Sequence, residues 1–164
     1  MVLGAIIQAR MNSTRLPGKT LIQIDSYGNM LDYVIKQSSH SKIIQKVIVA
    51  TTILEIDTPI VNHLKKFNIE VFRGDPENVL SRYYECALKF KIDPIVRITA
   101  DCPLIEPSII DKVIEKFQTG EYDYVSNNKP RTFPHGMDVE IFSFKTLEIA
   151  WKNSKLNSEK EHVT

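Results

Sequence analysis

The sequence predicts an α/β fold, with an open, mostly parallel β-sheet and helices on both faces. Short apolar runs rich in β-branched residues alternate along the chain with longer segments of helical periodicity. Three of the helical segments begin with a polar residue followed directly by proline, which suits the first turn of a helix. Strands that alternate with helices in this way are typical of parallel sheets whose two faces are both covered.

Length and composition are those of an ordinary globular protein. The 164 residues are enough for one domain with a substantial core, and we expect a single domain over residues 1–164. The formal net charge of +1 gives no bulk electrostatic reason to expect a nucleic acid or a membrane surface as a partner. Any anion-binding site must therefore come from local clustering of charge.

Five apolar runs are predicted to be strands, because their β-branched residues favour a strand over a short buried helix. They cover residues 2–7, 46–52, 69–72, 94–100 and 122–126. Residues 137–143 alternate in polarity and predict a further strand or hairpin arm.

Helices are predicted between these runs, over residues 57–67, 75–90 and 106–117. Asp57 or Thr58 would cap the first of them, and Asp75 would cap the second. Apolar side chains recur on one side of each helix, so we expect those sides to cover the sheet. Aromatic residues on helical patterns are also expected in the core: Tyr83, Tyr84 and Trp151.

Targeting and redox features favour a cytoplasmic protein. The first apolar run is too short for a secretory signal, and no stretch reaches the ~20 apolar residues of a membrane span. Cys86 and Cys102 lie far apart without a CxxC motif, so we expect reduced, partly buried thiols. The four histidines lack a metal-ligand spacing, and His63, on the polar flank of its helix, is expected to be solvated.

The loop after the first strand concentrates positive charge. It reads "QARMNSTRLPGKTL" over residues 8–21 and carries Arg10, Arg15 and Lys19. Each of these cations can make charge-assisted hydrogen bonds to phosphate oxygens. Small or polar residues, whose backbone N–H groups could also approach a phosphate, fill the rest of the loop: Asn12, Ser13, Thr14 and Gly18. Because ligands of parallel sheets bind beyond the carboxyl ends of the strands, phosphate binding is favoured over a merely solvated basic turn.

A phosphate-binding loop of the GxxxxGK[ST] type is an alternative. Residues 13–20, "STRLPGKT", match that pattern except that Ser13 replaces the first glycine. The pattern also requires a helix directly after its Lys-Thr, whereas "LIQID" over residues 21–25 predicts an extended piece. A nucleotide triphosphatase of this type is therefore the less favoured reading.

A carboxylate follows the predicted strand over residues 94–100. Asp101 stands in "TADCP" and could ligate Mg²⁺, which takes oxygen ligands and usually keeps waters and substrate phosphates as well. The alternative is that Asp101 only caps the segment before Pro103. A basic loop and an acidic metal ligand at neighbouring strand ends would together form a site for a metal–nucleotide complex.

Several segments together resemble one family. They are "AIIQARMNSTRLPGKTL", "VIVATT", "VFRGDPENVLSRYY", "RITADCPLIEP", "FPHGMDVEIFSFKTLEIAW" and "SEKEHVT", in this order along the chain. These segments resemble the motifs of sugar-activating cytidylyltransferases, which include the acylneuraminate and 3-deoxy-manno-octulosonate enzymes, and most of all the spore coat polysaccharide biosynthesis group. The resemblance implies a Rossmann-like nucleotidyltransferase fold. It also implies transfer of CMP from CTP to a sugar, commonly an acidic keto-sugar, with release of pyrophosphate, for surface polysaccharide or glycan biosynthesis.

The resemblance also implies roles for particular residues. Arg15, Lys19 and Asp101 would be catalytic, with Arg10 on the triphosphate and Mg²⁺ on Asp101. Candidates for the cytosine and ribose are Arg73, Gly74 and Asn78. Sugar contacts would come from His135, Gly136, Asp138, Glu140, Glu161 and His162. The segment over residues 134–140 is a dimer contact in many relatives, so a homodimer is expected.

The chain departs from the family pattern in two places. His135 stands where members often carry an acidic residue before the glycine. Relatives also continue beyond "EHVT" with a strand and an aspartate that supplies a second metal contact, so we expect this chain to lack the C-terminal segment and to catalyse poorly. A non-catalytic nucleotide-sugar-binding module is the corresponding alternative.

Overall fold

The central sheet has six strands in the order β5-β4-β1-β6-β8-β7 in the computed structural model, which describes residues 1–13 and 15–164. β1 pairs in parallel with β4 and with β6, and β5 pairs in parallel with β4. β8 and β7 extend the sheet in antiparallel fashion. The bounds are β1 (Val2–Gln8), β4 (Lys46–Thr52), β5 (Glu70–Gly74), β6 (Ile92–Thr99), β7 (Tyr124–Ser126) and β8 (Glu140–Phe142).

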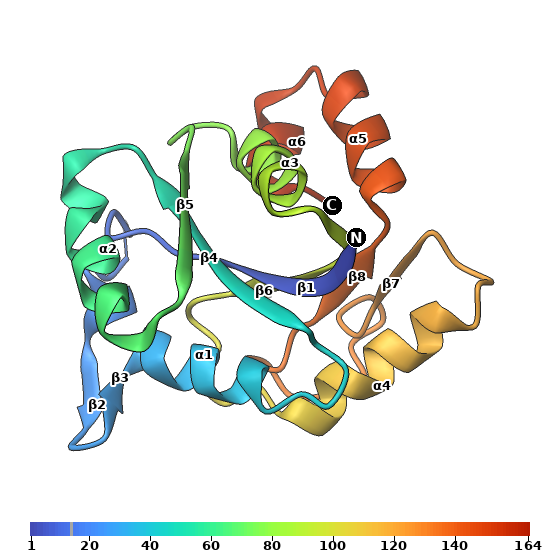
Figure 1. Cartoon of the computed structure of the whole chain (residues 1–164). Coiled ribbons are helices and arrows are strands. Elements are labelled where there is room, and N and C mark those ends of the chain that lie inside the picture. The colour runs from blue at the N-terminus through green and yellow to red at the C-terminus, as the bar shows by residue number, and fades with distance from the viewer. Residues whose placement is uncertain (14) are drawn as a thin grey trace.

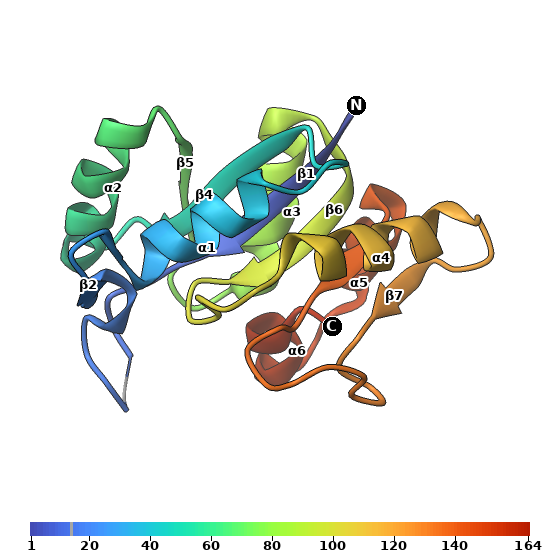
Figure 2. The same cartoon turned by 90° about the horizontal axis from the view of Figure 1, so that it is seen from below.

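Helices cover both faces of this sheet (Figure 1, Figure 2). Buried side chains of α1, α2 and α4 form one core cluster with the sheet, and those of α3 and α5 form a second cluster on the opposite face. The helices are α1 (Met30–Ser39), α2 (Thr58–Leu64), α3 (Val79–Phe90), α4 (Pro107–Gln118), α5 (Phe144–Asn153) and α6 (Asn157–His162). A short hairpin of β2 (Gln23–Asp25) and β3 (Gly28–Asn29) stands apart from the main sheet. The predicted fold class is confirmed.

The central strand β1 shows why its apolar run folds as a strand. Successive side chains of a strand point to opposite faces, and here Ala5 and Ile7 join one core cluster while Ile6 joins the other. All three side chains are fully buried. Apolar residues on both faces explain why the run is continuous rather than alternating, as expected for a strand inside a parallel sheet.

The predicted starts of two helices need correction. Asp75 does not cap α3: its Oδ1 accepts hydrogen bonds from the backbone N–H groups of Glu77 and Asn78, which closes a turn before the helix. Asn78 is the N-cap residue instead, and its side chain accepts from the N–H of Ser81 at 2.8 Å. Asp57 occupies the N-cap position of α2 but its side chain makes no capping bond. The third helix is confirmed as α4.

His63 is not solvated, contrary to the prediction. Its Nε2 lies 2.6 Å from Oδ1 of Asp32 and 3.0 Å from Nδ2 of Asn29, in a partly buried contact between α2 and the start of α1. The same Asp32 and Asn29 form the capping box of α1. Sequence periodicity placed His63 on a polar flank, but a polar flank can face another helix end as well as water.

The remaining expectations on burial hold with one difference. Tyr83 is fully buried, whereas Tyr84 and Trp151 are partly buried and stack on each other at a centroid distance of 4.2 Å. Cys86 and Cys102 are both buried and free. Within residues 1–13 and 15–164, none of the helices combines the length and apolar character that crossing a membrane requires.

Candidate functional site

The carboxyl ends of β1 and β6 lie side by side, as the sequence predicted. Gln8 pairs with Thr99 at the last rung of this parallel pair, and the N–H of Ala100 donates to the carbonyl of Gln8 at 3.1 Å. The loop after β1 and the segment "TADCP" after β6 therefore leave the sheet at the same level. This register brings two segments that are distant in sequence into one site.

Lys19 and Asp101 join these two segments. Lys19 Nζ lies 2.5 Å from Asp101 Oδ2, and Thr99 Oγ1 donates to Asp101 Oδ1 at 2.7 Å. Burial by itself raises the pKa of Asp101, but the hydrogen bonds from Lys19 and Thr99 outweigh it, so the pKa lies below its ordinary value. The next helix, α4, begins at Pro107 with Glu106 in its N-cap position, so Asp101 lies before that cap.

A polar cavity of about 210 Å³ opens between the two segments. Arg10, Arg15 and Lys19 all line it, and Asp101 is the one acidic residue among its described lining residues. The described residues that line it are Gln8, Ala9, Arg10, Ser13, Arg15, Lys19, Thr20, Thr99, Ala100 and Asp101. Three cations around one carboxylate leave an excess of positive charge, which suits a polyanion such as a triphosphate. Of the other predicted phosphate contacts, Asn12 is exposed and outside this lining, and Thr14 lies outside the described residues.

Backbone contacts shape the basic loop. Gly18 has a positive φ of 73°, a conformation that favours glycine, and its N–H donates to the carbonyl of Met11 at 2.8 Å. Thr20 Oγ1 donates to the carbonyl of Arg10 at 2.9 Å. After Gly18 the chain makes only one 3₁₀ turn, Lys19–Leu21, before β2. The helix that a GxxxxGK[ST] loop needs is therefore not found at this position.

A divalent metal ion fits this site only together with phosphates. Asp101 has a half-exposed carboxylate facing the cavity, which can offer an oxygen ligand. Across residues 1–13 and 15–164, no cluster of three or more His, Cys, Asp and Glu side chains could hold a metal ion. Mg²⁺ commonly binds through one or two carboxylates plus waters and substrate phosphates, so a single carboxylate at a phosphate site is compatible with it.

A second polar cavity of about 480 Å³ adjoins the first, because Arg10 lines both. One wall is the turn that precedes α3, which includes the predicted nucleotide residue Asn78. The opposite wall is α6, which contributes Asn157, Lys160 and the predicted sugar residue Glu161. Sequence reasoning missed Lys160, although its position beside Glu161 in "SEKEHVT" is a signal that could have found it.

Two of the three residues predicted for the cytosine and ribose, Arg73 and Gly74, lie outside both cavities. Arg73 uses its guanidinium on the protein itself: Nε donates to the carbonyl of Thr52, and Nη2 donates to the carbonyls of Ile53 and Leu54. Gly74 ends β5 in a tight space, where an added Cβ would lie 2.7 Å from the ring of Phe72. In this structure both residues build the scaffold beside the site.

The predicted sugar residues of the segment over residues 134–140 also lie outside both cavities. Glu140 is only 6% exposed and accepts from Arg97 Nη1 at 2.5 Å and from Thr164 Oγ1 at 2.5 Å. Asp138 forms an ion pair with Arg131. His135 and Gly136 lie on the turn before β8, His135 being exposed.

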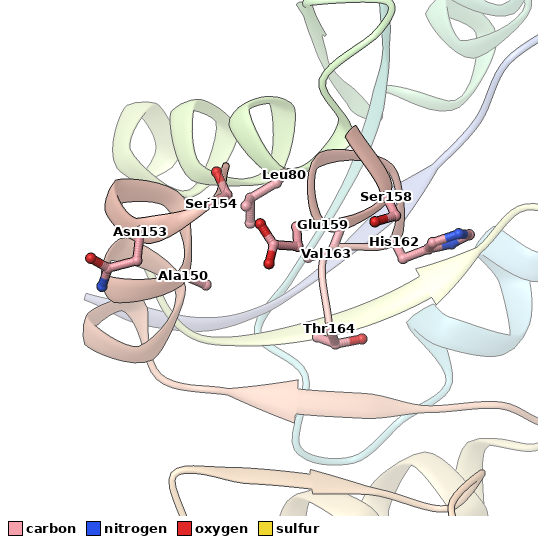
Figure 3. Close-up of a pocket in the computed structure, with 9 residues that line it drawn as sticks. All are labelled: Leu80, Ala150, Asn153, Ser154, Ser158, Glu159, His162, Val163 and Thr164. Carbon is pink, nitrogen blue, oxygen red and sulfur yellow. The ribbon is translucent and has the colours of Figure 1, made fainter. Parts of the chain in front are cut away.

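The remaining predicted sugar residue, His162, lines a third cavity of about 430 Å³. Figure 3 shows this cavity between α3, α5 and α6, with Leu80, Ala150 and Val163 around it. Glu161 and His162 are neighbours in sequence, but they line different cavities because successive helical residues point about 100° apart.

Comparisons with known proteins identify the family of this chain. A family model described as Cytidylyltransferase matches residues 4–164. The chain is 38% identical over 164 residues to uncharacterized protein MJ1063 of Methanocaldococcus jannaschii, covering 100% of this chain and 66% of that protein. It is 34% identical over 166 residues to spore coat polysaccharide biosynthesis protein SpsF of Bacillus subtilis, covering 97% of this chain and 67% of that protein. The chain thus spans about two thirds of the length of these relatives.

A solved structure and a further relative point the same way. The structure of a cytidylyltransferase from Leptospira borgpetersenii serovar Hardjo-bovis matches with a TM-score of 0.94 and 38% identity, over 99% of this chain and 69% of that one. The 3-deoxy-manno-octulosonate cytidylyltransferase of Geobacter sulfurreducens is 34% identical over 116 residues, which are 70% of this chain and 44% of that protein. With the family model matching almost the entire sequence and the fold matching that of a solved member, the chain belongs to the cytidylyltransferase family.

Proposed function

We propose that this chain carries out CTP-dependent nucleotidyl transfer, forming a CMP-sugar and releasing pyrophosphate. The observation that carries the proposal is the placement of Arg10, Arg15 and Lys19 around one cavity with Asp101. A nucleoside triphosphate brings several negative charges to one small volume, and this cavity offers several positive charges in a matching space. Membership of the cytidylyltransferase family supports CTP as the nucleotide.

The reaction depends mainly on the positioning of the reacting groups and on the stabilisation of negative charge. A sugar hydroxyl attacks the α-phosphorus in line and releases its proton to water. A new O–P bond forms, and the bond between the α-phosphorus and the oxygen that bridges to the β-phosphate breaks, so that pyrophosphate leaves. Arg15 and Lys19 would hold the β- and γ-phosphates and stabilise the charge that builds on the leaving group. Lys19 can turn from Asp101 to a phosphate oxygen, because its side chain is partly exposed at the cavity. Asp101 would hold Mg²⁺, which when bound supplies further positive charge to the phosphate oxygens.

We propose an acidic keto-sugar, used for surface polysaccharide or glycan synthesis, as the acceptor. The names of the relatives support this choice: one is a spore coat polysaccharide biosynthesis protein and another a 3-deoxy-manno-octulosonate cytidylyltransferase. The cavity between the turn before α3 and α6 adjoins the cationic cavity and has room for a nucleoside or sugar unit. A homodimer is proposed as the assembly, which light scattering on the purified protein would test.

The test is an assay of pyrophosphate release from CTP and Mg²⁺ with a panel of acidic keto-sugars and neutral sugars. The expected result is release that depends on both CTP and an acidic sugar, with CMP-sugar detected by mass spectrometry. Hydrolysis of ATP or GTP without any sugar would instead indicate a nucleotide triphosphatase. Binding of CTP without turnover of any sugar would favour the non-catalytic nucleotide-binding module.

A further inference from the structure

Asp57 stands at the N-cap position of α2 but does not cap the helix. It ends the 3₁₀ turn Glu55–Asp57, which runs directly into α2, and its own backbone is helical, with φ −91° and ψ −2°. Here Asp57 Oδ1 accepts the backbone N–H of Met11 at 2.7 Å, and Oδ2 accepts the hydroxyl of Thr52. The residue is 1% exposed, so this carboxylate is committed to these partners rather than to water.

The N–H that Asp57 binds belongs to the basic loop. Met11 directly follows Arg10, and the carbonyl of the same Met11 accepts the N–H of Gly18, which directly precedes Lys19. One residue, Met11, thus ties the beginning of the loop to its end, and Asp57 ties Met11 to the scaffold. Arg10 and Lys19 are the sequence neighbours of the two residues that this contact joins, Met11 and Gly18.

The carboxylate is itself held in place. Thr52 Oγ1 donates to Asp57 and also accepts the N–H of Leu54 at 3.1 Å. Arg73 donates to the carbonyls of Thr52, Ile53 and Leu54, so it fixes the connection between β4 and Asp57 from the other side. A buried and fully hydrogen-bonded support of this kind is what holds a binding loop in one conformation.

We propose that Asp57 is a positioning residue of the triphosphate-binding loop. This inference rests on the proposed function of that loop. Both carboxylate oxygens of Asp57 are used on the loop and on Thr52 rather than on the helix, as expected for a residue that supports a site. The loop cations are then ordered before nucleotide binds, so that less conformational entropy is lost on binding.

The experiment compares Asp57→Ala with Asp57→Asn. The Asn side chain keeps an oxygen that can accept the N–H of Met11, whereas Ala keeps none. A matched control is Asp111→Ala, because Asp111 on α4 likewise accepts from a hydroxyl and a backbone N–H, those of Ser41 at 2.5 Å and Lys42 at 3.1 Å, in a loop distant in sequence from the site. Two quantities are measured: affinity for CTP with Mg²⁺ by calorimetry, and hydrogen–deuterium exchange of residues 9–21 without nucleotide.

Asp57→Ala is expected to weaken CTP binding about tenfold, the scale of one hydrogen bond, and to speed exchange in residues 9–21. Asp57→Asn is expected to restore both toward wild type, and Asp111→Ala to leave both unchanged. If Asp57→Ala does not fold, Thr52→Val, which removes the hydroxyl that orients the carboxylate, should shift both quantities in the same direction by a smaller amount.

The inference is overturned if Asp57→Ala leaves exchange and affinity unchanged, or if Asp111→Ala changes them as much. Measurements on wild-type protein and on Lys19→Ala distinguish a failure of the proposed function from a failure of the positioning role of Asp57. If wild type fails to bind CTP, the proposed function is wrong, and the exchange of residues 9–21 alone then decides whether Asp57 holds the loop. If wild type binds CTP and Lys19→Ala weakens binding while Asp57→Ala does not, the function stands and the positioning role falls.

Discussion

Lys19 and Asp101 lie 82 positions apart in the chain, yet their side chains form an ion pair of 2.5 Å. The pair bridges the loop after β1 and the segment after β6, which are the two halves of the cationic cavity. Through this pair Asp101 compensates one of the three positive charges of the cavity. A triphosphate would compete with Asp101 for Lys19, so the pair is also the first contact that nucleotide binding is expected to change.

Replacing Arg15 or Lys19 by alanine should weaken CTP–Mg²⁺ binding and leave the fold intact. Each substitution removes a charged hydrogen bond to a phosphate, which is worth about 1.5–3 kcal/mol of binding free energy. Calorimetry gives the affinity and thermal melting the stability. Lys152→Ala is a suitable control, because that lysine pairs with Glu148 on α5 and is not among the lining residues of the cavity. Unchanged affinity in both Arg15→Ala and Lys19→Ala would remove the phosphate assignment.

Asp101→Asn should reduce metal-dependent CTP binding while changing stability little. Asparagine keeps the size of the side chain and can still accept the hydroxyl of Thr99, but it lacks the charge that attracts Mg²⁺. The measurement is the difference in CTP affinity with and without Mg²⁺, in wild type and variant. A variant that mainly unfolds yet keeps its metal-dependent binding would assign Asp101 a structural role only.

The Lys19–Asp101 pair should also leave a pH signature in stability. Because the pKa of Asp101 is lowered in the folded protein, the ionised carboxylate stabilises the fold above its ordinary pKa of about 3.9. That contribution is lost as the pH falls through the lowered pKa. The melting temperatures of wild type and Asp101→Asn should therefore differ by a small amount at neutral pH, because the Asp101 side chain is partly exposed, and should converge in acid. A difference that stays constant down to about pH 2 would contradict the lowered pKa.

Neither cysteine should react in the native protein. Burial raises the pKa of Cys86 to about 12, and burial also raises the pKa of Cys102 despite a hydrogen bond with Thr99. Thiolates are the reactive form, so at about pH 8 both thiols should resist iodoacetamide until the protein is unfolded. Mass spectrometry should find no modification before denaturation and two modified cysteines after it. Rapid labelling of either cysteine in the native protein would show that the structure around that cysteine opens locally.

Lys160 should make a modest electrostatic contribution to nucleotide binding. It faces the cavity that shares Arg10 with the cationic cavity, so Lys160→Ala should weaken CTP binding by up to about 1 kcal/mol. The loss should shrink at high salt, because partly exposed charges are screened. Lys155→Ala, in the same segment but outside the cavity lining, should have no such effect. Equal effects of the two variants would show that Lys160 acts only through the net charge of the protein and not through its place at the cavity.

The sequence was informative where the structure follows local periodicity. The apolar runs and proline-marked helix starts predicted the parallel sheet, and the sheet then predicted that the basic loop and Asp101 would meet at neighbouring strand ends. The cap of α3 was wrong by three residues, because Asp75 and Asn78 are equally good capping residues by type. Only the backbone conformation decides which of the two accepts from the helix.

Other features could not be read from the sequence because they join residues far apart without any periodic pattern. His63 meets Asp32, Glu140 meets Arg97 and Asp57 meets Met11 across separations of 31, 43 and 46 residues. In each case a polar group is satisfied inside the protein instead of by water, which depends on how helices and loops pack. The burial of Glu140 in particular could not be inferred from a motif that is rich in polar residues.

The pairing of Gln8 with Thr99 in β1 and β6 has a consequence for how the site can be assembled and altered. A slip of one residue between these strands would displace Asp101 by about 3.3 Å and reverse the faces of the inward side chains. Lys19 and Asp101 would then no longer be placed to pair, so their ion pair is expected to form only when β1 and β6 are correctly aligned. Substitutions in the two loops can change which ligand the site accepts without disturbing that alignment. Polar substitutions among the buried residues of β1 or β6 would instead displace the charged residues of both loops together.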